Sequence, residues 1–482
     1  MHKVLIALIS VLILFVTSCK KDITNNPAPG GSDTTSVSQT DLLKDSVYLY
    51  SKEIYLWHNV LPSYQAFNPR QYSGADDLKS ASAVMNAIRK LQPLDRFSFV
   101  TTKETSAGLQ TGANVDYGFF IKAAYVDKAD PIDSVRWFVT YVFNKSGAGL
   151  AGVNRGWYIN KINNTPITNS QSSIDLLNEV FFGSITSASF EFVKPDGTTL
   201  AASLSKTSFI SNSVLYDTVM NEGGKKTGYF VFKQFFGTPS RTELNTVFNN
   251  FKSQAIDELI VDLRYNPGGS TATQDALADL IAPASANNQV MYKYIYNDSL
   301  QQGNFPLLKR KTGYDNTSFA EANNTQTFEN TGGLHLNRVF FIVTGGTASA
   351  SELLINNLKP YMDVKLIGDT TYGKPVGFFP VDIFNYSIYP ISFKTVNSAG
   401  NADYYTGFAP DNLAPDGVNK NWGDVTDPSL ASALKYISTG SFRPALKSEQ
   451  IYKRQMTMQK QLEPANRLLE NNHFNGMFIE KK

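Results

Sequence analysis

Two kinds of hydrophobic pattern divide this chain. Over residues 41–61 and 76–91, apolar side chains recur every three or four positions, which predicts two amphipathic helices near the start. Later, short continuous runs of apolar, β-branched and aromatic residues occupy 259–263, 338–344 and 364–368. Such runs are typical of strands buried on both faces of a sheet. The pattern therefore predicts a helical N-terminal domain and, further along, an α/β core with a mixed sheet.

Between these regions, residues 111–207 have the pattern of a β-rich domain. A helix is predicted over 172–182, with Gly183 as its end. Residues 188–193 and 198–204 are predicted to pair as a hairpin around the turn Pro195-Asp196-Gly197. Residues 297–334, in contrast, are polar and irregular, which predicts a long functional loop or a partly disordered segment.

The first 19 residues form a predicted leader. Lys3 precedes an apolar run over 4–16, which is too short to span a bilayer comfortably and is followed by small residues and Cys19. The segment Val16-Thr17-Ser18-Cys19 resembles a bacterial lipoprotein cleavage site, which implies lipid attachment at Cys19 and a place in the cell envelope, in the periplasm or at the outer-membrane surface. An ordinary secretory leader with an incidental cysteine is the alternative. Residues 20–40 are rich in Asn, Pro, Gly, Ser and Thr and are predicted to be a flexible tether.

Composition narrows the function further. The chain has 44 basic and 42 acidic residues, so nothing in its charge indicates a nucleic-acid partner. The single cysteine excludes an intrachain disulfide. With 482 residues and 42% hydrophobic content, the chain is long enough for about three domains.

The chemistry concentrates in residues 337–374. A predicted strand breaks at Gly345-Gly346, and a helix follows, so Ser349 and Ser351 lie where the helix N-terminus favours negative charge. A serine nucleophile needs a base, and Lys374 is a better candidate than His335, because burial can lower the pKa of a lysine to about 7–8.

Two other interpretations of these residues remain open. Ser349 followed by Glu352 also fits a helix N-terminal capping box. Residues 368–374 fit the start of a phosphate-binding loop, GxxxxGK, but Pro375 stands where a hydroxyl residue is needed. The residues alone therefore permit a Ser/Lys dyad without requiring it.

Three motifs in order resemble the carboxyl-terminal processing (tail-specific) protease family, serine endopeptidases with an attached PDZ domain. They are LIVDLRYNPGG at 259–269, TASASE at 347–352 and GDTTYGK at 368–374. The resemblance implies that Ser349 is the nucleophile and that Lys374, 25 residues later, is the base. Ser351 is then only a neighbour.

The resemblance also implies the remaining parts of the site. The oxyanion hole maps onto backbone N–H groups of Gly268 or Gly269 and of Ala350. No metal or cofactor is implied, and the substrates are polypeptides with a free C-terminus. Separately from the resemblance, the long polar segment 297–334 is expected to border the substrate channel.

A second site is implied in the β-rich domain, where Tyr117-Gly118-Phe119-Phe120-Ile121 resembles the PDZ loop that receives a peptide carboxylate. Gly118, Phe119 and Phe120 are the residues expected to bind substrate there, and Gly118 permits the close approach of a ligand.

One departure from the family pattern bears on activity. Many members carry a glutamine four residues after the lysine, whereas this chain has Phe378. Phe378 and Phe379 supply an apolar wall that keeps Lys374 neutral, or the site is impaired. A catalytically inactive peptide-binding scaffold of the same fold is therefore the alternative function, and a small-ester hydrolase is a third, which the PDZ-like loop argues against.

The predicted organisation follows from these segments. It comprises a signal peptide (1–19), a tether (20–40), a helical N-terminal domain (41–105), a PDZ-like domain (111–207), an α/β protease core (208–440) and a C-terminal tail (441–482). The tail is polar and charged, and its sequence indicates no chemistry.

Overall fold

The computed structural model describes residues 37–125, 135–329, 331–442, 457–458, 460–470 and 476–480. Residues Thr40–Lys482 form one compact unit, and the candidate site lies within it. The predicted leader with Cys19 and most of the predicted tether lie outside the described residues. Within the described part, no helix is both long and apolar enough to cross a membrane.

The two predicted N-terminal helices are present as α1 (Gln39–Ile54) and α3 (Asp77–Lys90). Asp76 caps the second, its carboxylate accepting the N–H of Lys79 at 2.7 Å. The first ends earlier than predicted, and short turns follow it: η1 (His58–Val60), α2 (Tyr64–Phe67) and η2 (Pro69–Gln71).

The β-rich unit is also present. Its main sheet has the order β3-β4-β5-β7-β8, with β6 paired to β5. The first and last strands of the unit along the chain, β2 and β9, pair with each other as a separate two-stranded sheet. Its strands are β2 (Ala113–Asp116), β3 (Phe119–Tyr125), β4 (Val135–Val142), β5 (Tyr158–Ile162), β6 (Thr165–Pro166), β7 (Ser187–Val193), β8 (Thr199–Ser205) and β9 (Thr207–Ile210). Two helices, α5 (Gly147–Leu150) and α6 (Gln171–Phe182), complete it, around a core containing the buried rings of Trp137, Phe190 and Phe192.

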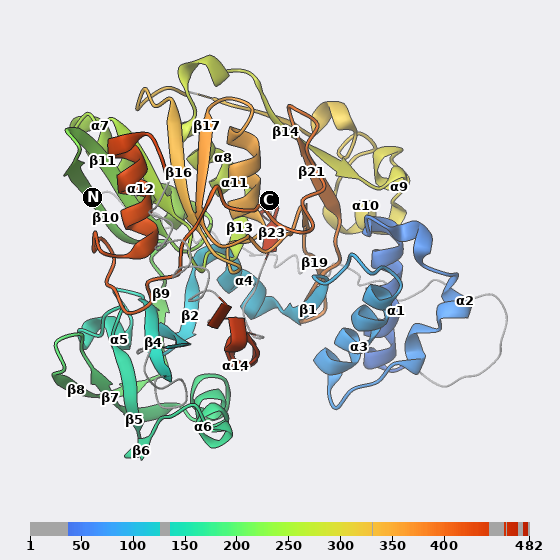
Figure 1. Cartoon of the computed structure of the whole chain (residues 1–482). Helices are drawn as coiled ribbons and strands as arrows, with labels where there is room; N and C mark the ends of the chain where they lie inside the picture. Colours follow the sequence, from blue (N-terminus) through green and yellow to red (C-terminus); the bar gives the residue numbers. More distant parts are fainter. Residues whose placement is uncertain are drawn as a thin grey trace, which may run out of the picture. The chain divides into compact units, whose positions relative to one another are not determined.

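The α/β core is built on a six-stranded sheet in the order β10-β11-β12-β16-β17-β22, in which only the β10-β11 pair is antiparallel. This confirms the predicted mixed sheet (Figure 1). The strands are β10 (Val214–Glu222), β11 (Lys225–Phe232), β12 (Glu258–Asp262), β16 (Arg338–Val343), β17 (Asp363–Gly368) and β22 (Asn412–Leu413).

Helices cover both faces of this sheet, which is why its central strands β12 and β16 are almost entirely buried. On one face, Ile260 and Phe340 pack against α12 (Pro428–Thr439). On the other, Val261 and Phe341 belong to the core formed with α7 (Thr238–Ser253), α8 (Thr271–Ile281) and α11 (Ala350–Leu358). Successive side chains point to opposite faces, as a strand requires.

The parallel strands bring the three motifs to one edge. β12 ends at Asp262, β16 at Val343 and β17 at Gly368, and each is followed by a motif segment. In an open parallel sheet, the loops after the carboxyl ends of the strands form the binding crevice. Gly268, Ser349 and Lys374 therefore belong to loops at the same edge.

The prediction of a long irregular loop over 297–334 is wrong. The segment contains α9 (Asp298–Gln301), α10 (Pro306–Thr312), η4 (Glu321–Asn323) and β15 (Thr325–Thr327). Asn297 caps α9, and the apolar side chains of Leu300 and Leu308 are fully buried. Other polar residues, such as Asp315 and Asn324, bond to the backbone of nearby turns, so a polar composition concealed short ordered elements.

Two smaller sheets complete the core. One has the order β15-β14-β21-β18 and the other β1-β20-β19. Their remaining strands are β1 (Phe99–Thr102), β14 (Val290–Tyr296), β18 (Val376–Gly377), β19 (Val381–Ile383), β20 (Tyr386–Tyr389) and β21 (Phe393–Asn397). A helix, α4 (Lys103–Thr111), leads from β1 to the β-rich unit.

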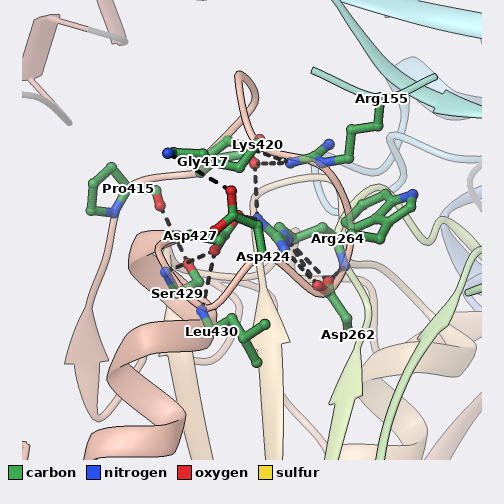
Figure 2. Close-up of polar contacts among 12 residues, drawn as sticks. Arg155, Asp262, Arg264, Pro415, Gly417, Lys420, Asp424, Asp427, Ser429 and Leu430 are labelled. Atoms are coloured by element: carbon green, nitrogen blue, oxygen red, sulfur yellow. Dashed lines mark hydrogen bonds and ion pairs between the residues drawn. The ribbon is translucent and has the colours of Figure 1, made fainter. Parts of the chain in front are cut away.

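A buried ionic network joins the β-rich unit to the core (Figure 2). Arg264 pairs with Asp262 at 2.6 Å, with Asp427 at 2.8 Å and with Asp416 at 3.3 Å. Arg155, from the β-rich unit, reaches the same Asp416 at 3.1 Å. Lys122 reaches Asp416 as well, at 3.9 Å. Three cations and three carboxylates thus compensate one another largely out of water, which is the condition under which buried charges are tolerated.

Candidate active site

Ser349 occupies a strained position immediately before α11. Its backbone has φ 63° and ψ −110°, a conformation that a residue with a β-carbon rarely adopts. Its hydroxyl oxygen is buried and has no hydrogen-bond partner in the structure. Strain and an unused hydroxyl at one residue are typical of a functional position. By contrast, Ser351 donates to the carbonyl of Asn266 at 3.3 Å.

Ser349 and Glu352 have the arrangement of a capping box, although the Ser349 hydroxyl makes no hydrogen bond of normal geometry. The carboxylate of Glu352 accepts the N–H of Ser349 at 2.9 Å, as in a capping box, whereas the Ser349 hydroxyl itself bonds to nothing. The same carboxylate accepts the N–H groups of Gly373 at 2.7 Å and Lys374 at 2.8 Å, and the hydroxyl of Thr371 at 2.5 Å. Four donors on one buried carboxylate fix the loop that carries Lys374 against the start of α11.

Lys374 is fully buried, as is Glu352. Burial holds the pKa of the Lys374 ammonium well below its usual value of 10.5, and the charges of Asp95 and Glu352 oppose part of that shift. Burial likewise raises the pKa of Glu352, against the effect of its four donors. A lysine of lowered pKa has the neutral amine that a general base requires.

Two aromatic rings lie close to the amine of Lys374. Nζ of Lys374 lies 4.0 Å from the ring centroid of Phe378 and 4.9 Å from that of Phe97. Phe378 thus forms the apolar wall that was one of its two predicted roles. Phe379 does not belong to this wall: its ring stacks on Phe319 at 5.4 Å.

Asp95 and Phe97 were missed by the sequence analysis as parts of the site. Residues 95–100 were predicted only as a linking strand, and the strand itself, β1, begins at Phe99. The carboxylate of Asp95 accepts the hydroxyl of Tyr55 at 2.8 Å and the N–H of Phe97 at 2.9 Å, so both residues are held in place. Adjacent acidic and aromatic residues in DRFSFV were the available signal, but nothing local indicated which lysine they would meet.

The glycine turn after β12 is fastened to the nucleophile loop by Asn266. Its side chain accepts the N–H of Gly268 at 2.9 Å, and its carbonyl accepts the N–H of Ala348 at 3.0 Å. Gly268 and Gly269 have φ of 99° and 142°, and an added β-carbon at Gly268 would come within 2.9 Å of the Ala350 nitrogen. The turn therefore lies directly against the start of α11, as an oxyanion site needs.

Of the two glycines, Gly269 has the better-oriented N–H. The N–H of Gly268 already donates to Asn266. The carbonyl of Gly268 and the N–H of Ser270 both bond to Phe235, so the alternation of a strand turns the backbone groups of Gly269 the other way.

That other side of the turn is occupied by the end of the chain. Residues Gly476–Phe478 form β23, which pairs in parallel with β13 (Gly268–Ser270). The tail was predicted to carry no chemistry, and β23 was not foreseen. The apolar run Met477-Phe478-Ile479 in an otherwise polar tail was the signal for it.

The predicted carboxylate-binding loop lies in the β-rich unit. Gly118 has φ 81°, its N–H donates to Asp116 at 2.5 Å, and an added β-carbon would collide with Ser146. Phe119 is buried in the unit's core, and Phe120 is half-buried. The role of these residues in binding substrate stays a prediction, as do the PDZ identity and lipid attachment at Cys19.

His335 is not part of this site. It lies in the loop before β16, whereas Ser349 follows the opposite end of that strand. Among the residues that the structure describes, no group of three or more His, Cys, Asp or Glu side chains is placed to hold a metal ion.

A strained serine, a buried lysine of lowered pKa and a glycine turn at the edge of a parallel sheet are typical of serine hydrolases that use lysine as the base. Residues 226–411 match Peptidase family S41. Residues 226–411 therefore form a peptidase family S41 domain, which agrees with the predicted resemblance to the carboxyl-terminal processing proteases.

Individual relatives agree with this assignment. A carboxyl-terminal-processing protease from Picosynechococcus sp. (strain ATCC 27264 / PCC 7002 / PR-6) is 27% identical over 165 residues, which are 34% of this chain and 33% of that protein. The match thus spans about a third of the relative's length.

One solved structure extends the similarity over most of the chain. A crystal structure from Bacteroides fragilis NCTC 9343, of a protein assigned to the S41 proteases, has a TM-score of 0.63 and 23% identity, and covers 86% of this chain and 100% of that one. This confirms the fold. The photosystem II D1 C-terminal processing protease has a TM-score of 0.48 and 16% identity over 84% of this chain and 98% of its own.

Proposed function

We propose that this chain is a serine endopeptidase that cuts polypeptides near their C-termini through an acyl-enzyme, with Ser349 as the nucleophile and Lys374 as the base. The observation that carries the proposal is the shared carboxylate of Glu352, which accepts the backbone N–H groups of both residues. It fixes an unpartnered hydroxyl and an amine of lowered pKa on adjoining loops.

The mechanism uses only groups of the chain and water. Neutral Lys374 takes the proton of the Ser349 hydroxyl as its oxygen attacks the peptide carbonyl carbon. The N–H groups of Gly269 and Ala350 stabilise the resulting oxyanion. Protonated Lys374 then gives the proton to the leaving amine, and water, deprotonated by the same lysine, hydrolyses the acyl-enzyme.

Two further features belong to the proposal. The β-rich unit acts as a PDZ domain that receives the substrate's C-terminal carboxylate at Gly118, Phe119 and Phe120. Lipid attachment at Cys19 holds the enzyme in the bacterial cell envelope. Comparing an acid-ended peptide with its amidated form tests the first, and palmitate labelling of wild type against Cys19→Ala tests the second.

The direct test uses the chain from Lys20 to Lys482 and an unstructured protein with an apolar C-terminus, with products identified by mass spectrometry. Fragments are expected with wild type and not with Ser349→Ala or Lys374→Ala, whose melting temperatures should stay close to that of wild type. Turnover retained in either variant overturns the assignment. So does a lack of fragments from both wild type and a chain ending at residue 475.

The alternative, a peptide-binding scaffold without hydrolysis, is motivated by Phe378 in place of glutamine. It predicts that wild type and Ser349→Ala bind C-terminal peptides equally and that neither releases fragments. The ring centroid of Phe378 lies 4.0 Å from Nζ of Lys374, so the lysine amine has an apolar neighbour that favours its neutral form. A neutral base is therefore available without the glutamine, which favours the peptidase.

A further inference from the structure

Strand β23 lies beside β13 near the C-terminus (Figure 1), and its backbone bonds to β13 on one side and to the segment around Phe378 on the other. On one side, the N–H of Gly476 donates to Pro267 at 3.1 Å, and β23 continues in parallel register with β13. On the other, the N–H of Phe378 donates to Met477, and the N–H of Ile479 donates to Phe378, each at 3.0 Å. Addition of a strand between two backbone edges is a standard way to bind an extended peptide.

This strand runs past the groups proposed for catalysis. An added β-carbon at Gly268 would lie 2.9 Å from both the Gly476 carbonyl oxygen and the Ala350 nitrogen, so a carbonyl of the tail stands beside the proposed oxyanion donors. The backbone groups of Gly269 face the same strand. A substrate carbonyl would have to occupy this place, and Ser349 has no exposed surface while the tail fills it.

Side chains anchor the tail specifically. Met477 and Phe478 are buried, with 0% and 1% of their surface exposed. Glu480 pairs with Arg241 at 2.6 Å and also accepts the hydroxyl of Ser270. The carboxylate of Glu480, three residues after the buried Met477, thus pairs with the cation of Arg241. The contacts therefore depend on the side chains of the tail and not on its backbone alone.

The tail also makes a second contact with a backbone edge. β3 is the edge strand of the β-rich unit, and helix α14 (Glu463–Glu470) packs against β3 and α6. The side chain of Asn466 accepts the N–H of Ala123 at 2.8 Å and donates to the carbonyl of Ala123 at 3.4 Å. An amide side chain therefore occupies backbone groups of β3 that a bound strand would use.

We propose that the groove between β13 and β18 is the binding site for an extended polypeptide with two consecutive apolar side chains followed, two residues later, by an acidic one, and that residues 476–480 fill it as an intramolecular substrate mimic. The chain's own tail then lowers its turnover. The effect on turnover rests on the proposed peptidase function, whereas the binding of the tail can be tested without catalysis.

The binding test uses a fluorescein-labelled peptide of residues 475–482, NGMFIEKK, and fluorescence anisotropy. In a Ser349→Ala background, a chain ending at residue 475 is expected to bind the peptide at least tenfold more tightly than the chain ending at Lys482. The Glu480→Gln peptide should bind several-fold more weakly than the natural one. Equal affinity of both chains for the natural peptide overturns the proposal.

The activity test separates the two hypotheses. When Ser349 is intact, truncation of the chain after residue 475 is expected to raise turnover at least fivefold. Adding the peptide should reverse this gain. Selective peptide binding without turnover in any chain refutes the peptidase function and leaves the tail site standing. Equal turnover in both chains, with no selective binding, refutes the tail site and leaves the peptidase standing.

A point variant covers the case in which truncation unfolds the core. Glu480→Gln keeps the buried anchors and breaks the pair with Arg241, so turnover should rise about twofold or more. Glu321→Gln, which breaks the exposed pair with Lys293, is the matched control and should leave turnover unchanged. Identical turnover of the two variants contradicts the proposal.

Discussion

The backbone N–H groups of Ser349 and Lys374 donate to the same atom, Oε2 of Glu352, at 2.9 and 2.8 Å. Two residues 25 positions apart are thereby held to one oxygen, and their separation depends on a side chain that takes no part in the proposed proton transfers. Glu352 is therefore a positioning residue, and small changes in the placement of reacting groups lower the catalytic rate strongly.

Glu352→Gln should lower kcat about 10²-fold with little change in KM. The side-chain NH₂ group of glutamine would face backbone N–H groups that now donate to the carboxylate. Two donors cannot bond to each other, so the loop that carries Lys374 shifts. Because Glu352 also raises the pKa of Lys374, the acidic limb of the pH–rate profile should move to lower pH. Steady-state kinetics across pH measure both effects.

The matched control for this change is Glu243→Gln. The Glu243 carboxylate also accepts two backbone N–H groups, of Ser213 and Val214, each at 2.8 Å, but lies on α7 outside the site. It should lower stability without changing kcat. An equal loss of kcat in both variants would show that Glu352 acts only through general stability.

Asp95→Asn should shift the acidic limb of the kcat/KM profile to lower pH. Asp95 raises the pKa of Lys374, so removing its charge lowers that pKa further, and the neutral base persists to more acidic pH. Asparagine keeps an oxygen for the N–H groups of Phe97 and Ser98, which the carboxylate accepts at 2.9 Å each.

Asp45→Asn, which weakens the pairing with Arg70 in the same N-terminal region, is the control and should leave the profile in place. A shift of the acidic limb to higher pH in Asp95→Asn would mean that Lys374 is not the group that titrates.

The sequence predicted the parts of the site that lie within short motifs. Ser349 and Lys374 follow buried strands, and the Ser349–Glu352 spacing is visible as a local pattern. Asp95 and β23 come from segments more than 100 residues away, and such pairings leave no periodicity in either segment. The error over 297–334 has a different cause, since polar residues that cap a short helix or bond to the backbone of turns have the composition of a loop.

Arg264→Met should lower the free energy of unfolding by about 3–5 kcal/mol, because it leaves three buried carboxylates facing two remaining cations, Arg155 and Lys122. Urea denaturation followed by tryptophan fluorescence measures this. Lys293→Met breaks an exposed pair and should cost only about 0–1 kcal/mol. Comparable losses in the two variants would mean that burial does not set the cost.

Lys233→Met should stabilise the fold, and more so at low pH than at high pH. Lys233 is buried, with its Nζ 4.8 Å from the ring centroid of Tyr141, and burial lowers its pKa to about 7 from a usual 10.5. Between these values the unfolded chain binds the extra proton, so stability rises with pH over that window and the penalty of burial is fully present below pH 7.

Methionine fills a similar volume without a charge, so the variant should melt several degrees higher than wild type at pH 6, and the difference should shrink as the pH approaches 10. Calorimetric melts at pH 6, 8 and 9.5 follow the trend. Lys226→Met, on an exposed position of β11, the strand that ends just before Lys233, should show no such pH dependence. A constant difference across pH would mean that the Lys233 amine carries no proton linked to folding, and that its packing alone accounts for the change.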